Sequence, residues 1–101
     1  GRIDWSLAAQ QVYNLHRAVA PPYPGAFTDI KGQRYVIERA RLAKGALLDA
    51  ARRLPPGLAV VDNHILGVCG DGAALHIHSL LLDSADGAAI SAPQLNERLQ
   101  A

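Results

Sequence analysis

A proline-rich segment, Asn14–Phe27, constrains the fold more than any other part of the sequence. Each of its three prolines fixes its own φ at about −65° and pushes the preceding residue toward extended geometry. A helix that enters this segment must therefore stop at about Ala20. Gly25, directly after the last proline, permits a positive φ or a close backbone approach at little cost. We expect the segment to fix the orientation of the preceding helix relative to the strand that follows.

Composition indicates a single small domain with a mainly aliphatic core. The chain has 101 residues, of which 50% are hydrophobic, with one Trp, three Tyr and one Phe. The chain has ten Lys and Arg residues and nine Asp and Glu residues, which gives a net charge of +1. A domain that binds mainly phosphate is usually strongly basic, and this chain is not. Cys69 is the single cysteine, so neither an internal disulfide nor a cysteine zinc framework can form. These features fit a reducing, cytoplasmic setting.

The sequence has no segment that predicts membrane insertion or secretion. No apolar run approaches the about 20 residues that span a bilayer, and the first residues lack the apolar stretch of a signal peptide. The chain contains no methionine, and we expect it to be a piece of a longer protein. Residues 1–101 would form one domain of that protein, without its catalytic part.

Apolar residues at helical spacing predict a helix over Leu7–Val19, with Ser6 as its N-cap. The predicted apolar stripe consists of Ala8, Val12, Leu15 and Val19. Trp5, just before the cap, is expected to pack back on the helix.

After the prolines, short segments bounded by turn residues predict five strands. The strands are Ala26–Ile30, Arg34–Leu42, Leu58–Val61, Ile65–Cys69 and Ala74–Leu82. In the second strand, alternation places Val36, Ala40 and Leu42 toward the core. Helical spacing returns over Lys44–Leu54 and over Pro93–Leu99. We predict a mainly β fold with flanking helices, a small five-stranded OB-like barrel preceded by an N-terminal helix; an open α+β sheet is the alternative.

Two histidines on the last predicted strand raise the possibility of a metal site. His76 and His78 alternate, so both rings project from one face. They could bind a metal if a third ligand arrived, for example His64 or Asp62. No spacing fixes such a ligand, so we favour an exposed strand face and predict no metal.

Catalysis by the residues of this chain is not expected. Cys69 ends an apolar strand, where a cysteine usually behaves as a small buried hydrophobe. Ser79 and His78 are neighbours on a strand and face opposite sides, so with Asp83 they form no triad. The Gly70–Gly72 segment leads into a strand rather than a helix, which predicts a hairpin turn and not a phosphate loop.

Seven basic residues fall between positions 31 and 53. They are Lys31, Arg34, Arg39, Arg41, Lys44, Arg52 and Arg53. Such a patch could bind RNA phosphate or a nucleotide sugar, or it could be an ordinary solvated surface.

Several segments of the chain, taken in order, resemble one known family. They are Ile3-Asp4-Trp5-Ser6, Val12-Tyr13-Asn14-Leu15-His16-Arg17-Ala18, Pro22-Tyr23-Pro24-Gly25-Ala26-Phe27, Pro56-Gly57 and Val68-Cys69-Gly70-Asp71-Gly72-Ala73. Together they resemble the C-terminal domain of the formyltransferases. That family includes methionyl-tRNA formyltransferase and the UDP-4-amino-4-deoxy-L-arabinose formyltransferase of the polymyxin-resistance pathway.

The resemblance implies an OB-fold domain that follows a Rossmann-like catalytic domain. In the family, the catalytic domain uses an Asn, a His and an Asp to transfer formyl from 10-formyltetrahydrofolate to a primary amine. No catalytic residue of the family carries over to this chain, so the chain alone should be inactive and hold no cofactor. Its partner would be the catalytic domain of the same chain.

The acceptor implied by the resemblance is an amino-sugar nucleotide, with tRNA as the alternative. The low net charge favours the nucleotide sugar, because tRNA affinity should rise with each phosphate neutralised. The Lys44–Leu54 helix is an insertion relative to the usual family pattern, without an assigned role.

Five residues would then face the catalytic domain and form one wall of its cleft. They are Asn14, Arg17, Tyr23, Pro24 and Gly25. The alternative is a structural role, in which these residues only fix the orientation of the barrel. A third possibility is that the domain contacts a following domain or a second subunit.

Overall fold

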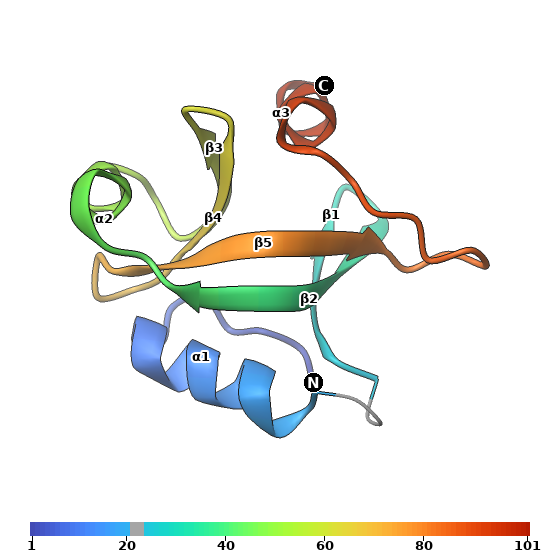
Figure 1. Cartoon of the computed structure of the whole chain (residues 1–101), viewed down its shortest axis with the longest axis horizontal. Coiled ribbons are helices and arrows are strands. Elements are labelled where there is room, and N and C mark those ends of the chain that lie inside the picture. The colour runs from blue at the N-terminus through green and yellow to red at the C-terminus, as the bar shows by residue number, and fades with distance from the viewer. Residues whose placement is uncertain (21–23) are drawn as a thin grey trace.

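The computed structural model describes residues 1–20 and 24–101, and it is built on one antiparallel sheet (Figure 1). Its strands are β1 (Ala26–Ile30), β2 (Gln33–Leu42), β3 (Gly57–Val61), β4 (His64–Val68) and β5 (Ala74–Leu82). They lie in the order β1-β2-β5-β4-β3. Within the described residues the outer strands do not pair with each other, so the curled sheet is a half-barrel. The predicted five strands and mainly β fold are confirmed.

Tight two-residue turns set the register of the two outer hairpins. Lys31 and Gly32 have φ angles of 50° and 83°, and Asp62 and Asn63 have 48° and 64°. Two consecutive positive φ angles give the type I′ turn whose twist matches that of paired strands. The strand predicted to begin at Ile65 begins one residue earlier, because His64 is the first residue of β4.

The predicted inner face of β2 is wrong for its first half. Tyr35 and Ile37 are buried, whereas Val36 is half-buried. The pairing of β2 with β5 is irregular at Arg39, opposite Ser79. Beyond that irregularity the even-numbered instead of the odd-numbered residues of β2 point toward the core, so Ala40 and Leu42 pack on it as predicted. Strict alternation of inward and outward residues does not hold across such an irregularity.

Helix α1 (Ala9–Ala18) ends before the prolines, as predicted, but begins two residues later than expected. Ser6 is not its N-cap, because the Ser6 hydroxyl donates to the Asp4 carboxylate instead, at 2.6 Å. The N-cap is Ala8, which has no capping side chain. Asp71 takes over that role from the β4–β5 turn, because its carboxylate accepts from the Ala9 amide at 3.3 Å.

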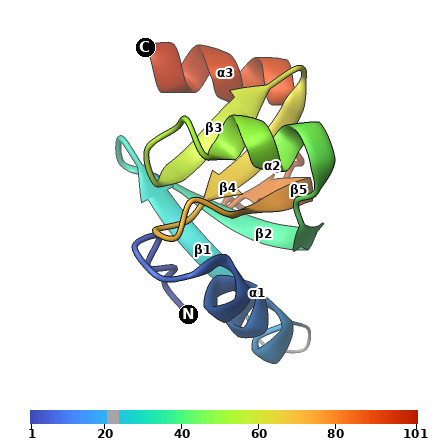
Figure 2. The same ribbon diagram turned by 90° about the vertical axis from the view of Figure 1, so that its left-hand side faces the viewer.

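Two further helices cover the sheet (Figure 2). Helix α2 (Gly45–Ala51) packs Ala51 against Leu66 and Val68 of β4. Helix α3 (Ala92–Gln100) begins with a capping box at Ser91 and buries Leu95 completely. Both are the helices that the sequence predicted, with shorter bounds for α2. Among the described residues, no helix is long and apolar enough to cross a membrane.

Candidate functional site

A cavity of about 140 Å³ lies where the end of α1 meets the segment after the prolines and the middle of β2. Pro24 and Gly25 form one wall, while Val36 and Glu38 come from β2. His16 of α1 also contributes to the lining. Leu81 of β5 completes the lining, so four separate parts of the chain meet at the segment that constrains the fold.

Gly25 shapes this wall because its backbone admits no side chain. Its φ is +98°, in the region that favours glycine, and a Cβ there would lie 2.9 Å from Val36 Cγ1. The amino terminus of Gly1 donates to the Gly25 carbonyl at 3.1 Å. Phe27, two residues later, donates its amide to the Gly1 carbonyl at 3.1 Å. The N-terminal residues thus hold the wall against β1.

His16 is the functional candidate that sequence reasoning missed. Its side chain is only 8% exposed, and Nδ1 has no hydrogen-bond partner among the described residues. It also lines a second cavity of about 280 Å³, together with Arg39, Arg41 and His78. The buried face of α1 is Ala9, Val12 and His16, whose spacing of three and four was available in the sequence.

Stability is expected to fall as pH decreases below about 7, because burial lowers the pKa of the His16 imidazole. In that range the unfolded chain binds more protons than the folded chain, so the free energy of unfolding decreases as pH falls. The pKa values of His76 and His78 are lowered as well, which acts in the same direction. Thermal denaturation at several pH values measures the effect. His16→Leu should reduce the pH dependence without removing it, and an unchanged pH dependence would contradict the assignment.

The five residues predicted for the cleft wall do not all meet. Pro24 and Gly25 line the cavity. Asn14 and Arg17 lie on α1, where the Asn14 side-chain oxygen accepts from Gln10 at 3.0 Å and the Arg17 guanidinium lies 5.7 Å from the Tyr13 ring centroid. Tyr23 lies outside the described residues. Whether these residues face a catalytic domain stays a prediction.

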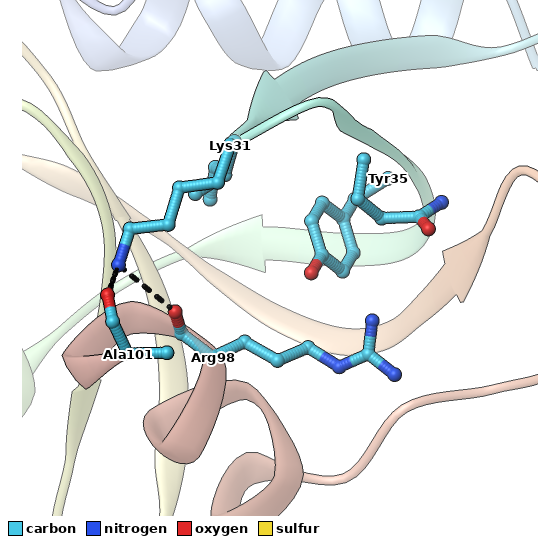
Figure 3. Close-up of a pocket in the computed structure, with 6 residues that line it drawn as sticks. Lys31, Tyr35, Arg98 and Ala101 are labelled. Atoms are coloured by element: carbon cyan, nitrogen blue, oxygen red, sulfur yellow. Dashed lines mark hydrogen bonds between the residues drawn. The ribbon is translucent and has the colours of Figure 1, made fainter.

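The basic residues between positions 31 and 53 have different surroundings. Lys31 donates to backbone oxygens at the C-terminal end of α3, beside a pocket that Tyr35 and Arg98 also line (Figure 3). A cation there offsets the negative end of the helix dipole. Arg52 lies 3.9 Å from Asp49, while Arg39 and Arg41 share the larger cavity near His16. Lys44 precedes α2 and Arg53 follows it.

Arg34 belongs to an ion-pair cluster at the β1–β2 hairpin. Its Nε lies 3.0 Å from Asp29, which Arg2 also contacts at 2.7 Å. The hydrogen bond from Arg34, followed by that from Arg2, lowers the pKa of the Asp29 carboxyl. Both guanidinium groups also lie over the Phe27 ring, at 3.9 Å for Arg34 and 5.0 Å for Arg2.

Three histidines gather on β4 and β5. His64 Nδ1 lies 3.1 Å from His76 Nε2, and the ring centroids of His76 and His78 are 4.2 Å apart. Burial and then the neighbouring histidines and Arg41 lower the pKa of His76. Burial, followed by the charges of Arg41 and Arg39, also lowers the pKa of His78.

The remaining catalytic candidates have structural surroundings. Cys69 is buried, as predicted, and its thiol donates to the Gly67 carbonyl at 3.5 Å. Burial, followed by the charge of Asp71, raises the pKa of that thiol to about 12, so it is not an activated nucleophile. The Ser79 hydroxyl donates to Glu38 at 2.6 Å rather than to His78.

Comparison with protein-family models agrees with this architecture. The model described as "Formyl transferase, C-terminal domain" matches residues 1–99, which is almost the whole chain. The match covers the helix, the proline-rich segment and all five strands. The chain therefore belongs to the family of formyl transferase C-terminal domains.

Proposed function

We propose that this domain is the non-catalytic part of a formyltransferase that acts on an amino-sugar nucleotide of the UDP-4-amino-4-deoxy-L-arabinose type. Membership of the family supports the formyltransferase parent. The parent would use 10-formyltetrahydrofolate, bound by its catalytic domain, as the formyl donor. The role of the present domain is to position one wall of the acceptor site.

Electrostatics favours the sugar nucleotide over tRNA. The net charge is +1, and Arg34 and Arg52 each lie within ion-pair distance of a carboxylate. Lys31 contacts the end of α3. Since each phosphate contact needs an available cation, these contacts leave only Arg39, Arg41, Lys44 and Arg53 of the seven basic residues for a nucleic acid.

The acceptor can be tested with the full-length parent and 10-formyltetrahydrofolate. We expect formylation of UDP-4-amino-4-deoxy-L-arabinose and none of methionyl-tRNA. Formylation of methionyl-tRNA instead would overturn the proposed acceptor. A salt-dependent mobility shift of tRNA with this domain would support the tRNA alternative.

The cleft-wall role can be tested separately at Gly25. Gly25→Ala in the parent is expected to lower kcat/KM for the acceptor by about tenfold, because the new Cβ displaces the wall beside Val36. Gly32→Ala is the matched control, since Gly32 has a similar φ of +83° but no atom within 4 Å of the new Cβ. Equal kcat/KM values for the two folded variants would show that Gly25 has only a structural role.

A further inference from the structure

The histidine cluster on β4 and β5 has a geometry that the proposed function does not use. His64 is the first residue of β4, and His76 lies on the neighbouring strand β5. Antiparallel pairing brings Leu66 opposite His76, which places the two histidines on the same face of the sheet. The rings of His64 and His76 pack edge to face, with an interplanar angle of 75° and a centroid separation of 5.0 Å. The sequence named His64 as a possible third ligand beside His76 and His78, and the fold brings His64 next to His76.

We propose that His64 and His76 form a two-histidine binding site for a divalent late transition metal, with water completing the coordination. Two imidazoles at metal–nitrogen distances of about 2.0–2.1 Å have nitrogens about 2.9 Å apart at a right angle and about 3.4 Å apart at a tetrahedral angle. The observed separation of 3.1 Å between His64 Nδ1 and His76 Nε2 lies between these values. The backbone of β4 and β5 therefore already holds these two nitrogens at a separation that a shared metal ion requires.

The ligand type selects the class of metal. Imidazole nitrogen suits Zn²⁺, Ni²⁺ and Cu²⁺, whereas Mg²⁺ and Ca²⁺ prefer oxygen. In residues 1–20 and 24–101, no group of three or more His, Cys, Asp or Glu is placed to hold an ion together. The site therefore has two protein ligands and open positions for water or another ligand, and the resulting affinity is lower than that of a closed structural zinc site.

The test is calorimetric titration of the tag-free chain with Zn²⁺ and with Ni²⁺ at about pH 7.5, where histidine is mainly neutral. We expect one ion per chain, and a loss of affinity of at least about tenfold in His64→Gln and in His76→Gln. His78→Gln is the matched control, because His78 lies on the same strand and packs on His76 without belonging to the pair. Absence of binding, or equal losses in all three variants, would overturn the proposal.

Arg41 supplies a second test, because its charge should affect the affinity of the site for a cation. Arg41 lies directly opposite His76 in the β2–β5 pairing, so its positive charge opposes a bound cation. Arg41→Gln is therefore expected to raise the affinity for Ni²⁺ by about two- to fivefold. A fall in Ni²⁺ affinity in this variant would contradict a cation at His76. In the unmodified chain, Cu²⁺ should broaden the ring NMR signals of His64, His76 and the adjacent His78 more strongly than those of His16. Stronger broadening of His16 than of His64 and His76 would also overturn the site.

Discussion

Gly70→Ala is expected to lower the free energy of unfolding by about 3 kcal/mol or more, which is at the upper end for an overpacked site. A Cβ at Gly70 would lie 1.9 Å from the Ser6 carbonyl oxygen and 2.6 Å from its carbon. Both are backbone atoms, so no side-chain rotation can relieve the contact. The Gly70 amide also donates to the Leu7 carbonyl at 2.9 Å, so the two segments cannot separate without losing that hydrogen bond. Urea denaturation of both proteins gives the difference.

Gly87→Ala provides the control for this prediction. Gly87 has a φ of +57°, and a Cβ there would have no heavy atom within 4 Å. Its replacement should cost about 1 kcal/mol, from the left-handed backbone alone. If Gly70→Ala costs no more than Gly87→Ala, the close approach at Gly70 does not hold the two segments together.

The same contact shows what local patterns in the sequence could not predict. The Gly70–Gly72 segment was correctly interpreted as a turn, because glycine, aspartate and the flanking strands are local signals. Its second role is to cap α1 through Asp71, which lies 62 positions from Ala9 in the sequence. Local propensity favoured Ser6 as the cap, but the Ser6 hydroxyl instead donates to Asp4, two residues earlier in the sequence. A cap supplied by a residue this far away produces no recognisable sequence signal next to the helix.

Strand bounds and burial follow the sequence where alternation is regular. The prediction gave the bounds of β1 and β5 correctly, because turn residues mark both ends of each strand. It failed for Tyr35 and Ile37 because the pairing irregularity at Arg39 changes the phase of β2. An irregularity of this kind depends on the partner strand, and one strand read alone does not contain it.

The candidate site was predicted only in part, for a related reason. Prolines and glycine at positions 24 and 25 identify a rigid segment, and the cavity wall lies there. His16 was missed because the predicted stripe was built from apolar residues alone, although His16 shares a helical spacing with Ala9 and Val12. The proximity of His64 to His76 depends on the register of β4 against β5. The sequence could name His64 as a candidate, but only the register fixes the distance.

Gly67→Ala is the second substitution with a large expected effect, and Trp5 is its cause. A Cβ at Gly67 would lie 2.4 Å from both Cη2 and Cζ3 of the Trp5 ring. The ring is anchored at its other end, because the indole N–H donates to the Thr28 hydroxyl at 3.0 Å. Moving the ring away would break this hydrogen bond and leave the buried Thr28 side chain without it. We expect a loss of about 2 kcal/mol in the free energy of unfolding.

A double-mutant cycle separates this ring contact from any intrinsic effect of alanine in β4. Trp5→Leu should itself destabilise the domain by about 2–3 kcal/mol, because it removes a large ring from the core and the donor to Thr28. Leucine has no atoms where Cη2 and Cζ3 lie, so adding Gly67→Ala in that background should cost little. The expected coupling energy is about 1–2 kcal/mol, measured by urea denaturation of the four proteins. Additive losses would instead mean that Gly67 is required by the strand itself, and that Trp5 does not determine the residue at position 67.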